Sequence, residues 1–334
     1  MNETESLLKV RDLSVQYISD EATVQALSNV SFDIKKGVTL GLVGETGAGK
    51  TTIAKSIMRL IQTPPGKFES GEIFYDGTDL LKLSQVEMQR VRGAQVSMIF
   101  QDPMTALDPV MTVGKQIAEV ISTHEKCSNA EAMNRAKQML ETVGIQPKRA
   151  DEYPHQFSGG MKQRVVIAIA LACNPNLLIA DEPTTALDVT IQAQVLDLMR
   201  NLREKMGTSL LLITHDLGVV AQICENVAIV YAGEIVEYGT CRQIFHSIAH
   251  PYTEGLFGSV PNLSKEEDRL SPIEGLMPDP SNLPSGCKFH PRCKYAKEIC
   301  SRVNPPLTDI GEGHMTRCCL GTPISTPENG GAAC

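Results

Sequence analysis

One stretch of eight residues constrains this chain more than any other, because its glycine spacing is compatible with few folds. It fits the phosphate-loop pattern of Gly, four residues, Gly, Lys and then Ser or Thr, and reads Gly44-Glu45-Thr46-Gly47-Ala48-Gly49-Lys50-Thr51. The apolar run 38–43 before it predicts a buried strand, and residues 51–60 after it predict a helix. A strand, a glycine-rich turn and a helix in this order are typical of an α/β fold.

Each residue type in this loop suits the binding of a polyphosphate. The glycines let the backbone turn its N–H groups toward one point, where the start of the new helix adds positive potential. Lys50 can reach the outer two phosphates, and the Thr51 hydroxyl can take one coordination position on Mg²⁺. The alternative is a plain glycine-rich turn, which the correct flanks on both sides disfavour.

Composition limits which other functions are open to the chain. Its 334 residues are enough for one large or two moderate domains, and 42% apolar residues can supply a core. A net charge of -8 and 4% aromatic residues predict no broad basic surface and few stacking platforms for nucleic acid, although a local basic patch stays open. We therefore expect a globular protein with no nucleic-acid partner.

No segment predicts insertion into a membrane. The longest uninterrupted apolar run, residues 165–173, is too short to cross a bilayer, and the acidic start at residues 1–6 is unlike a signal peptide. We expect a protein that is cytosolic or peripheral to a membrane. In a cytosolic chain the ten cysteines, six of them from Cys287 onward, are expected to be thiols or metal ligands rather than disulfides.

The residues before the phosphate loop predict a β layer. Residues 7–17 and 24–34 alternate apolar and polar side chains, as two half-buried strands do. Tyr17 ends the first strand, where its ring could stack on the base of a nucleotide. A half-buried strand tyrosine with no ligand is the alternative interpretation.

The residues after the loop predict strands and then helices. Residues 71–77 indicate a short strand and turn, and residues 96–100 a strand that ends at Gln101. Residues 112–143 then change to a helical period. Met133, Ala136, Leu140 and Val143 are expected on one face of an amphipathic helix there. We expect an inserted helical subdomain over about residues 102–165.

A second candidate anion site follows this region. Ser158 can cap a helix that runs to about residue 173, and Gly159 and Gly160 would let a ligand approach the first-turn N–H groups. By itself the signal is weak, because Ser-Gly-Gly also serves as an ordinary loop and cap.

Two later strands end at residues that could carry chemistry. Residues 177–180 predict a buried strand followed by Asp181, suited to the metal shell, and Glu182, suited to activating water as a general base. An exposed acidic turn is the alternative. Residues 210–214 predict another strand, and His215 at its end could face the γ-phosphate, although most histidines are ordinary surface or core groups.

Taken in order, these motifs resemble the ATP-binding subunits of ABC transporters over about residues 7–240. The resemblance makes the phosphate loop a Walker A motif, Gln101 the Q-loop glutamine and His215 the switch histidine. It also makes residues 157–161 the signature motif, residues 177–182 the Walker B motif and residues 185–188 the D-loop. Small departures from the common motifs occur at Phe157, Met161 and Thr185.

The resemblance implies a fold, cofactors and site residues. The fold would be an α/β nucleotide-binding domain over residues 1–240, with a RecA-like parallel-sheet core, an antiparallel β layer and the helical insert. Two chains would sandwich two ATP molecules, with catalytic roles for Glu182, His215 and Gln101 and a Mg²⁺ site at Thr51, Gln101 and Asp181. The implied ATP-binding residues are Tyr17, Gly44, Glu45, Thr46, Gly47, Ala48, Gly49, Lys50, Thr51, Thr52, Ser158, Gly159, Gly160 and Asp188.

Three further segments narrow the resemblance to the dipeptide and oligopeptide importers. The segments that carry it are residues 101–109, His250-Pro251-Tyr252-Thr253 and residues 287–293. The resemblance implies peptide uptake, with a second ATPase subunit, identical or paralogous, two membrane permease subunits and a separate solute-binding protein. Relatives that import nickel or other small solutes stay as an alternative. A DNA-maintenance ATPase would carry long coiled coils and a ribosome-associated factor two cassettes, and the sequence has neither pattern.

The C-terminal extension, residues 241–334, predicts a metal centre. Its segment 278–306 is rich in proline and poor in large apolar residues, so we expect it to need a covalent cross-link or a bound metal for stability. Gaps of five, six and seventeen residues separate Cys287, Cys293, Cys300 and Cys318. These gaps are wider than the close pairs typical of zinc and favour an iron–sulfur cluster, with zinc or free thiols as alternatives. The resemblance implies a 4Fe-4S cluster, with Cys319 as an alternative to Cys318. The cysteines at 127, 173, 224 and 241 are expected to be ordinary thiols.

Overall fold

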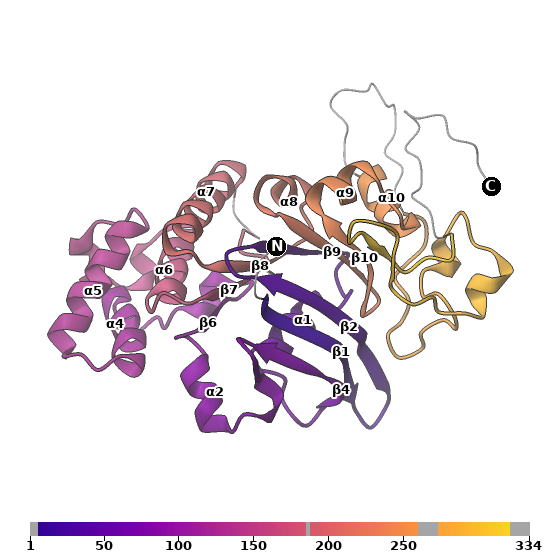
Figure 1. Ribbon diagram of the computed structural model, residues 1–334. Helices are drawn as coiled ribbons and strands as arrows, with labels where there is room; N and C mark the ends of the chain where they lie inside the picture. Colours follow the sequence, from indigo (N-terminus) through magenta and orange to yellow (C-terminus); the bar gives the residue numbers. More distant parts are fainter. Residues whose placement is uncertain (1–5, 185–187, 260–272, 321–334) are drawn as a thin grey trace. The chain divides into compact units, whose positions relative to one another are not determined.

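The computed structural model describes residues 6–184, 188–259 and 273–320, and it divides into two compact units. Of the described residues, the first unit contains 6–7, 34–39, 79–184 and 188–213, and the second contains 8–33, 40–78, 214–259 and 273–320. Each unit contains strands and helices, labelled in Figure 1. Among the described residues, no helix has both the length and the apolar character needed to span a bilayer.

The first unit is built on three parallel strands in the order β8, β7, β6. These strands are β6 (Val96–Ile99), β7 (Leu177–Asp181) and β8 (Ser209–Thr214), and every residue in them is buried. Ile99 is in register with Ala180, and Asp181 with Ile213. Since parallel strands end at the same edge of a sheet, the residues that follow them are brought close together.

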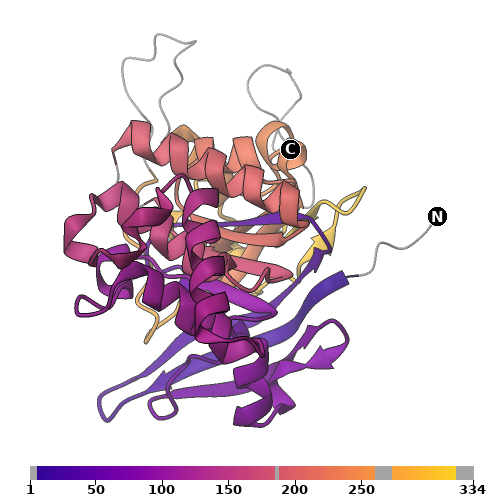
Figure 2. The same cartoon turned by 90° about the vertical axis from the view of Figure 1, so that its left-hand side faces the viewer.

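The helices of the first unit pack against its strands and against one another. The helices are α2 (Gln85–Val91), α3 (Pro103–Ala106), α4 (Val113–His124), α5 (Asn129–Thr142), α6 (Gly159–Leu171) and α7 (Val189–Met206). Helix α6 contacts β6 and α7, and it also contacts α4 and α5, which Figure 2 shows packed beside it. Its residues from Val165 to Ala168 are all buried, as expected where consecutive apolar residues cover every side of a helix.

The second unit begins with an antiparallel sheet in the order β2, β1, β4, β5. Its strands are β1 (Ser6–Ile18), β2 (Thr23–Lys35), β4 (Gly66–Tyr75) and β5 (Thr78–Asp79). Strand β1 runs antiparallel to β4, so that Tyr17 lies opposite Gly66. The alternating burial along β1 and β2 matches the alternation of their side chains, and the predicted β layer is confirmed.

The phosphate loop belongs to a second group of strands in this unit. Strand β3 (Thr39–Val43) pairs in parallel with β9 (Asn226–Tyr231), and β9 pairs antiparallel with β10 (Glu234–Thr240). Helix α1 (Lys50–Ile57) follows the loop, and α8 (Leu217–Ile223) precedes β9. The predicted α/β class is confirmed.

The C-terminal extension is tied to β10. It contains α9 (Cys241–His246), α10 (Pro251–Gly258), two 3₁₀ turns and the short strands β11 (Thr308–Asp309) and β12 (Met315–Thr316). Strand β12 pairs antiparallel with β10, and His314 Nε2 lies 2.8 Å from Glu237 Oε1. Phe289 and Lys288 are buried, so the segment 278–306 buries more than its composition predicted.

Candidate functional site

The phosphate loop joins β3 to α1 in the conformation that its glycines allow. Gly49 is the N-cap of α1 with a φ of 105°, and a Cβ there would lie 2.9 Å from the carbonyl oxygen of Ala26. A Cβ at Gly44 would lie 2.2 Å from the carbonyl oxygen of Val230. Both positions therefore require glycine, because any side chain would force the backbone apart.

Lys50 lies inside the phosphate loop and binds the backbone of the loop. Its side chain is 5% exposed, and its Nζ donates to the carbonyl oxygens of Gly44 at 2.7 Å and Glu45 at 3.0 Å. An ammonium, the neighbouring Thr51 hydroxyl and the N–H groups that begin an eight-residue helix form a donor set suited to a polyphosphate. The loop therefore fits ATP, and Thr51 would supply an oxygen ligand to its Mg²⁺.

Glu45, the second residue of the loop, is held by the C-terminal extension. Its carboxylate accepts hydrogen bonds from Arg292 Nη1 at 2.8 Å and Nη2 at 3.1 Å. Its backbone N–H donates to the hydroxyl of Tyr252 at 2.9 Å. No sequence motif assigned this role to Arg292, although a carboxylate inside a phosphate-binding loop is itself a signal that a cation must lie nearby.

The first unit brings Gln101 and Glu182 together. Gln101 follows β6 and Glu182 follows β7, and Gln101 Nε2 donates to Glu182 Oε2 at 3.0 Å. Glu182 has a φ of 46°, and its N–H donates to the carbonyl oxygen of Ile213 at 2.8 Å. Asp181, the last residue of β7, is 2% exposed. An acid held beside an amide at the end of a parallel strand is suited to orienting a water molecule.

The signature residues lie where α6 begins. Ser158 is the N-cap residue of α6, but among the described residues its hydroxyl accepts no capping hydrogen bond, so the predicted side-chain cap is wrong. A Cβ at Gly159 would meet no described atom within 4 Å, whereas a Cβ at Gly160 would lie 2.5 Å from Ile191 Cγ2. Gly159 is therefore open to a ligand, and Gly160 is needed for packing against α7.

The remaining predicted site residues occupy separate positions. Asp188 caps α7 by accepting from the N–H groups of Thr190 and Ile191, while D-loop residues 185–187 lie outside the described residues. His215 is exposed and directly follows β8. Tyr17 is half-buried near the end of β1. Thr51 belongs to the second unit and Gln101 and Asp181 to the first, so their shared Mg²⁺ site stays a prediction.

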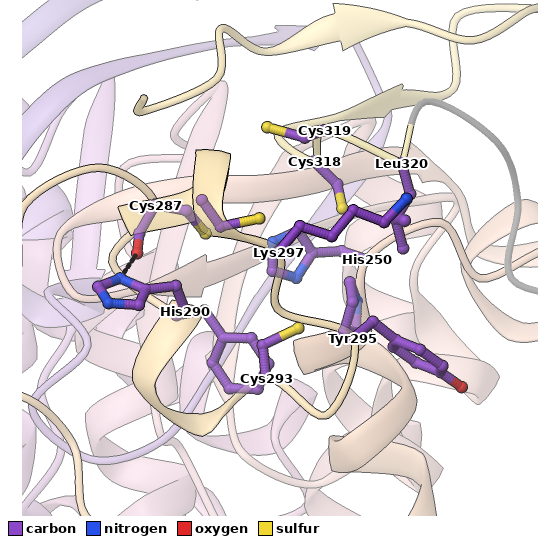
Figure 3. A pocket seen from close by; sticks show the side chains of 12 residues that line it. His250, Cys287, His290, Cys293, Tyr295, Lys297, Cys318, Cys319 and Leu320 are labelled. Atoms are coloured by element: carbon purple, nitrogen blue, oxygen red, sulfur yellow. Dashed lines mark hydrogen bonds between the residues drawn. The ribbon is translucent and has the colours of Figure 1, made fainter. Parts of the chain in front are cut away.

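The cysteines of the extension line one small pocket. Those that line it, drawn in Figure 3, are Cys287, Cys293, Cys300, Cys318 and Cys319, together with His250. His290 Nδ1 lies 2.9 Å from the carbonyl oxygen of Cys287. Burial raises the pKa of Cys287 and of Cys318 to about 11, and it also raises the pKa of Cys293.

The predicted iron–sulfur cluster is wrong. Within residues 6–184, 188–259 and 273–320, no group of three or more His, Cys, Asp or Glu side chains could hold a metal ion. Burial raises the pKa of Cys287 and of Cys318 and so favours the neutral thiol over the thiolate that a metal ion requires. The same finding gives no support to the zinc alternative. All nine described cysteines, including the four in residues 127–241, are free thiols.

Comparison with known proteins defines the class first. A family model described as "ABC transporter" matches residues 27–185. The dimeric structure of MJ0796, a bacterial ABC transporter cassette, is 30% identical with a TM-score of 0.63, covering 70% of this chain and 99% of that chain. The chain therefore has the fold of an ABC ATP-binding cassette.

More similar relatives define the group within this class. A second family model, "Oligopeptide/dipeptide transporter, C-terminal region", matches residues 236–300. The oligopeptide transport ATP-binding protein OppD of Bacillus subtilis (strain 168) is 52% identical, over 93% of this chain and 88% of that protein. The dipeptide transport ATP-binding protein DppD of the same organism is 49% identical over 95% of each. This chain belongs to the family of oligopeptide and dipeptide ABC transporter ATP-binding proteins.

Proposed function

We propose that this chain is an ATPase subunit that powers the import of dipeptides and oligopeptides across the cytoplasmic membrane. The observation that carries the proposal is the pairing of Gln101 with Glu182 beside the buried Asp181, at the end of a parallel strand. The relatives, which are oligopeptide and dipeptide transport ATP-binding proteins, support the substrate class over nickel and over DNA or ribosome functions.

Each site residue then has a distinct role. Lys50 and the loop N–H groups bind the outer phosphates, and Tyr17 stacks on the base. Thr51, Gln101 and Asp181 would hold Mg²⁺, which would stabilise the negative charge of the phosphates. Glu182 accepts a proton from the attacking water, and His215 faces the γ-phosphate. The open Gly159 and the neighbouring Ser158 and Gly160 contact the nucleotide of a second chain.

The working assembly would contain several subunits. Two ATPase subunits, identical or paralogous, would form a dimer, which the dimeric structure of the similar MJ0796 cassette supports. This dimer would dock on two permease subunits. A separate solute-binding protein would deliver the peptide. The chain would then be peripheral on the cytoplasmic face of the membrane, held there by its partners. We keep the predicted division into residues 1–240 and 241–334, with a helical subdomain over about residues 102–165, as part of this proposal.

The decisive experiment compares Glu182→Gln with Lys50→Ala. Glu182→Gln keeps the shape and the hydrogen bond to Gln101 but removes the base, so ATP turnover should fall by about a hundredfold or more while ATP binding survives. Lys50→Ala should weaken ATP binding itself, because a phosphate-paired charge is lost. Glu204→Gln, which changes an exposed acid on α7, serves as the control.

Transport requires a separate measurement. The chain is reconstituted with its permeases in vesicles, and ATP-dependent uptake of a labelled dipeptide is compared with uptake of Ni²⁺. Wild-type turnover by Glu182→Gln would contradict the catalytic assignment. Uptake of Ni²⁺ without peptide would contradict the substrate class and leave the ATPase assignment intact.

A further inference from the structure

The start of the phosphate loop is fixed from three directions at one residue. The carbonyl oxygen of Glu45 accepts from Lys50 Nζ at 3.0 Å, and its N–H donates to Tyr252 at 2.9 Å. Its carboxylate is held by both terminal nitrogens of Arg292. Two of these three partners belong to the C-terminal extension, so the extension has a direct physical connection to the loop.

Arg292 is itself held rigidly. Its side chain is 7% exposed, and its Nε donates to the carbonyl oxygen of Glu274 at 2.9 Å. The guanidinium carbon lies 5.8 Å from the centre of the Tyr231 ring, which packs against Tyr252 and Phe289. A bidentate arginine with a locked side chain fixes both the position and the orientation of the carboxylate that it binds.

The charge of Glu45 explains why the loop needs such a partner. A carboxylate beside a polyphosphate repels it, and the repulsion is strong where water is largely excluded. The Glu45 side chain is 27% exposed, so solvent screens it only in part. Pairing with Arg292 neutralises this charge and directs the carboxylate toward the extension.

We infer that Arg292 is a positioning residue for nucleotide binding, which holds Glu45 and neutralises its charge so that the phosphate loop can accept ATP. The inference rests on the proposed function of the loop and adds a role for the extension. The Tyr252 hydroxyl also holds Glu45, by accepting a hydrogen bond from the backbone N–H of Glu45. Arg292 acts through Glu45 and is assigned no contact with the nucleotide.

The test varies the charges of Arg292 and Glu45 and measures ATP affinity, because a purely structural role of Arg292 would not depend on the charge of Glu45. Dissociation constants for ATP are measured by calorimetry on the full chain for Arg292→Gln, Glu45→Gln and the double variant. Arg292→Gln leaves the Glu45 carboxylate unpaired, so ATP binding should weaken about tenfold. Glu45→Gln removes the repelling charge and should have a smaller effect. The double variant should recover to the level of Glu45→Gln.

Two further variants control the experiment. Lys294→Gln breaks an exposed pair with Glu254 elsewhere in the extension and should leave ATP binding unchanged. Arg292→Lys keeps the charge but loses the bidentate geometry, and its binding should lie between wild type and Arg292→Gln. If Arg292→Gln does not fold, Arg292→Lys and the double variant still make the comparison, since neither leaves an unpaired carboxylate.

The outcomes separate this inference from the proposed function. Wild-type affinity in Arg292→Gln, or a double variant as weak as Arg292→Gln, would overturn the positioning role. Either result is interpreted only if the wild-type chain binds ATP and Lys50→Ala binds it more weakly. Absence of ATP binding by the wild-type chain would instead overturn the proposed function.

Discussion

Glu182 is positioned by its backbone as well as by its side chain. Its φ of 46° places it in the left-handed region, which costs a residue with a side chain about 1 kcal/mol. The hydrogen bond from its N–H to Ile213 helps to hold this conformation. Backbone strain of this kind is concentrated at functional positions, and here it turns the acid toward Gln101.

Gln101 should connect ATP chemistry to transport. It contacts Glu182 on one side, and the helices that begin at α3 follow it directly in the chain. We expect Gln101→Ala to lower peptide transport more than it lowers the basal ATPase activity of the isolated chain. Both rates are measured, the first in vesicles with the permeases and the second without them. An equal loss of both would argue against a coupling role.

The sequence predicted residues that follow parallel strands better than it predicted contacts between distant segments. Gln101 and Glu182 meet because β6 and β7 end at one edge of a sheet, and each strand is visible as an apolar run. Arg292 and Glu45 are 247 residues apart, and no local pattern pairs them. The sequence shows how many cysteines the extension has and how far apart they lie in the chain. It does not show how the thiols are arranged in space, or the burial that raises their pKa values.

Element boundaries show the same limit. The predicted helical region 112–143 contains two helices, because the chain leaves the α conformation after His124 and starts again at Ser128, which accepts from the N–H of Glu131. Within α5, Ala132 is buried, whereas Met133 is only half-buried. The buried face of this helix therefore begins one residue earlier than predicted. The packing of α5 against α4 and α6 determines which residue is buried there.

Helix α10 should make stability depend on pH through its cap. His250 caps it by accepting from the N–H of Tyr252 at 3.1 Å, and burial lowers the pKa of His250 from 6.5 to about 3. The unfolded chain therefore binds a proton before the native chain does as pH falls. The stabilising contribution is complete above pH 6.5 and is lost between 6.5 and about 3.

The corresponding variant is His250→Asn, which keeps a capping acceptor but does not titrate. Between pH 7 and pH 5, His250 should remove about 2 kcal/mol from the free energy of unfolding of the wild-type chain. Urea unfolding at each pH measures this loss, which should be smaller by that amount in the variant. An identical pH dependence in both chains would contradict the assignment.

Buried polar pairs join the C-terminal extension to the rest of its unit. Lys288 Nζ lies 3.2 Å from Glu234 Oε1, with side chains 10% and 4% exposed, and it also donates to Ser28 Oγ at 3.0 Å. Lys288→Met leaves the Glu234 carboxylate buried beside a hydrocarbon chain, so the free energy of unfolding should fall by about 3 to 5 kcal/mol.

The matched control is Lys294→Met. Lys294 pairs with Glu254 at 2.8 Å, but its side chain is 65% exposed, so its loss should cost less than about 1 kcal/mol. Chemical denaturation of the two variants beside wild type makes the comparison. A loss as small in Lys288→Met as in Lys294→Met would show that the buried pair of Lys288 with Glu234 contributes little to the stability.

ATP hydrolysis should require two chains. The phosphate loop and Glu182 lie on one chain, whereas the exposed Gly159 at the start of α6 is open to a ligand that its own chain need not hold. If that ligand is the nucleotide of a second copy, the ATPase rate per chain should rise with chain concentration until dimers dominate. Rates are measured without permeases over about a hundredfold range of concentration, and sedimentation gives the dimer fraction. Glu182→Gln should dimerise with ATP and stay inactive throughout. A constant rate per chain over a range in which the dimer fraction changes would show that one chain is sufficient.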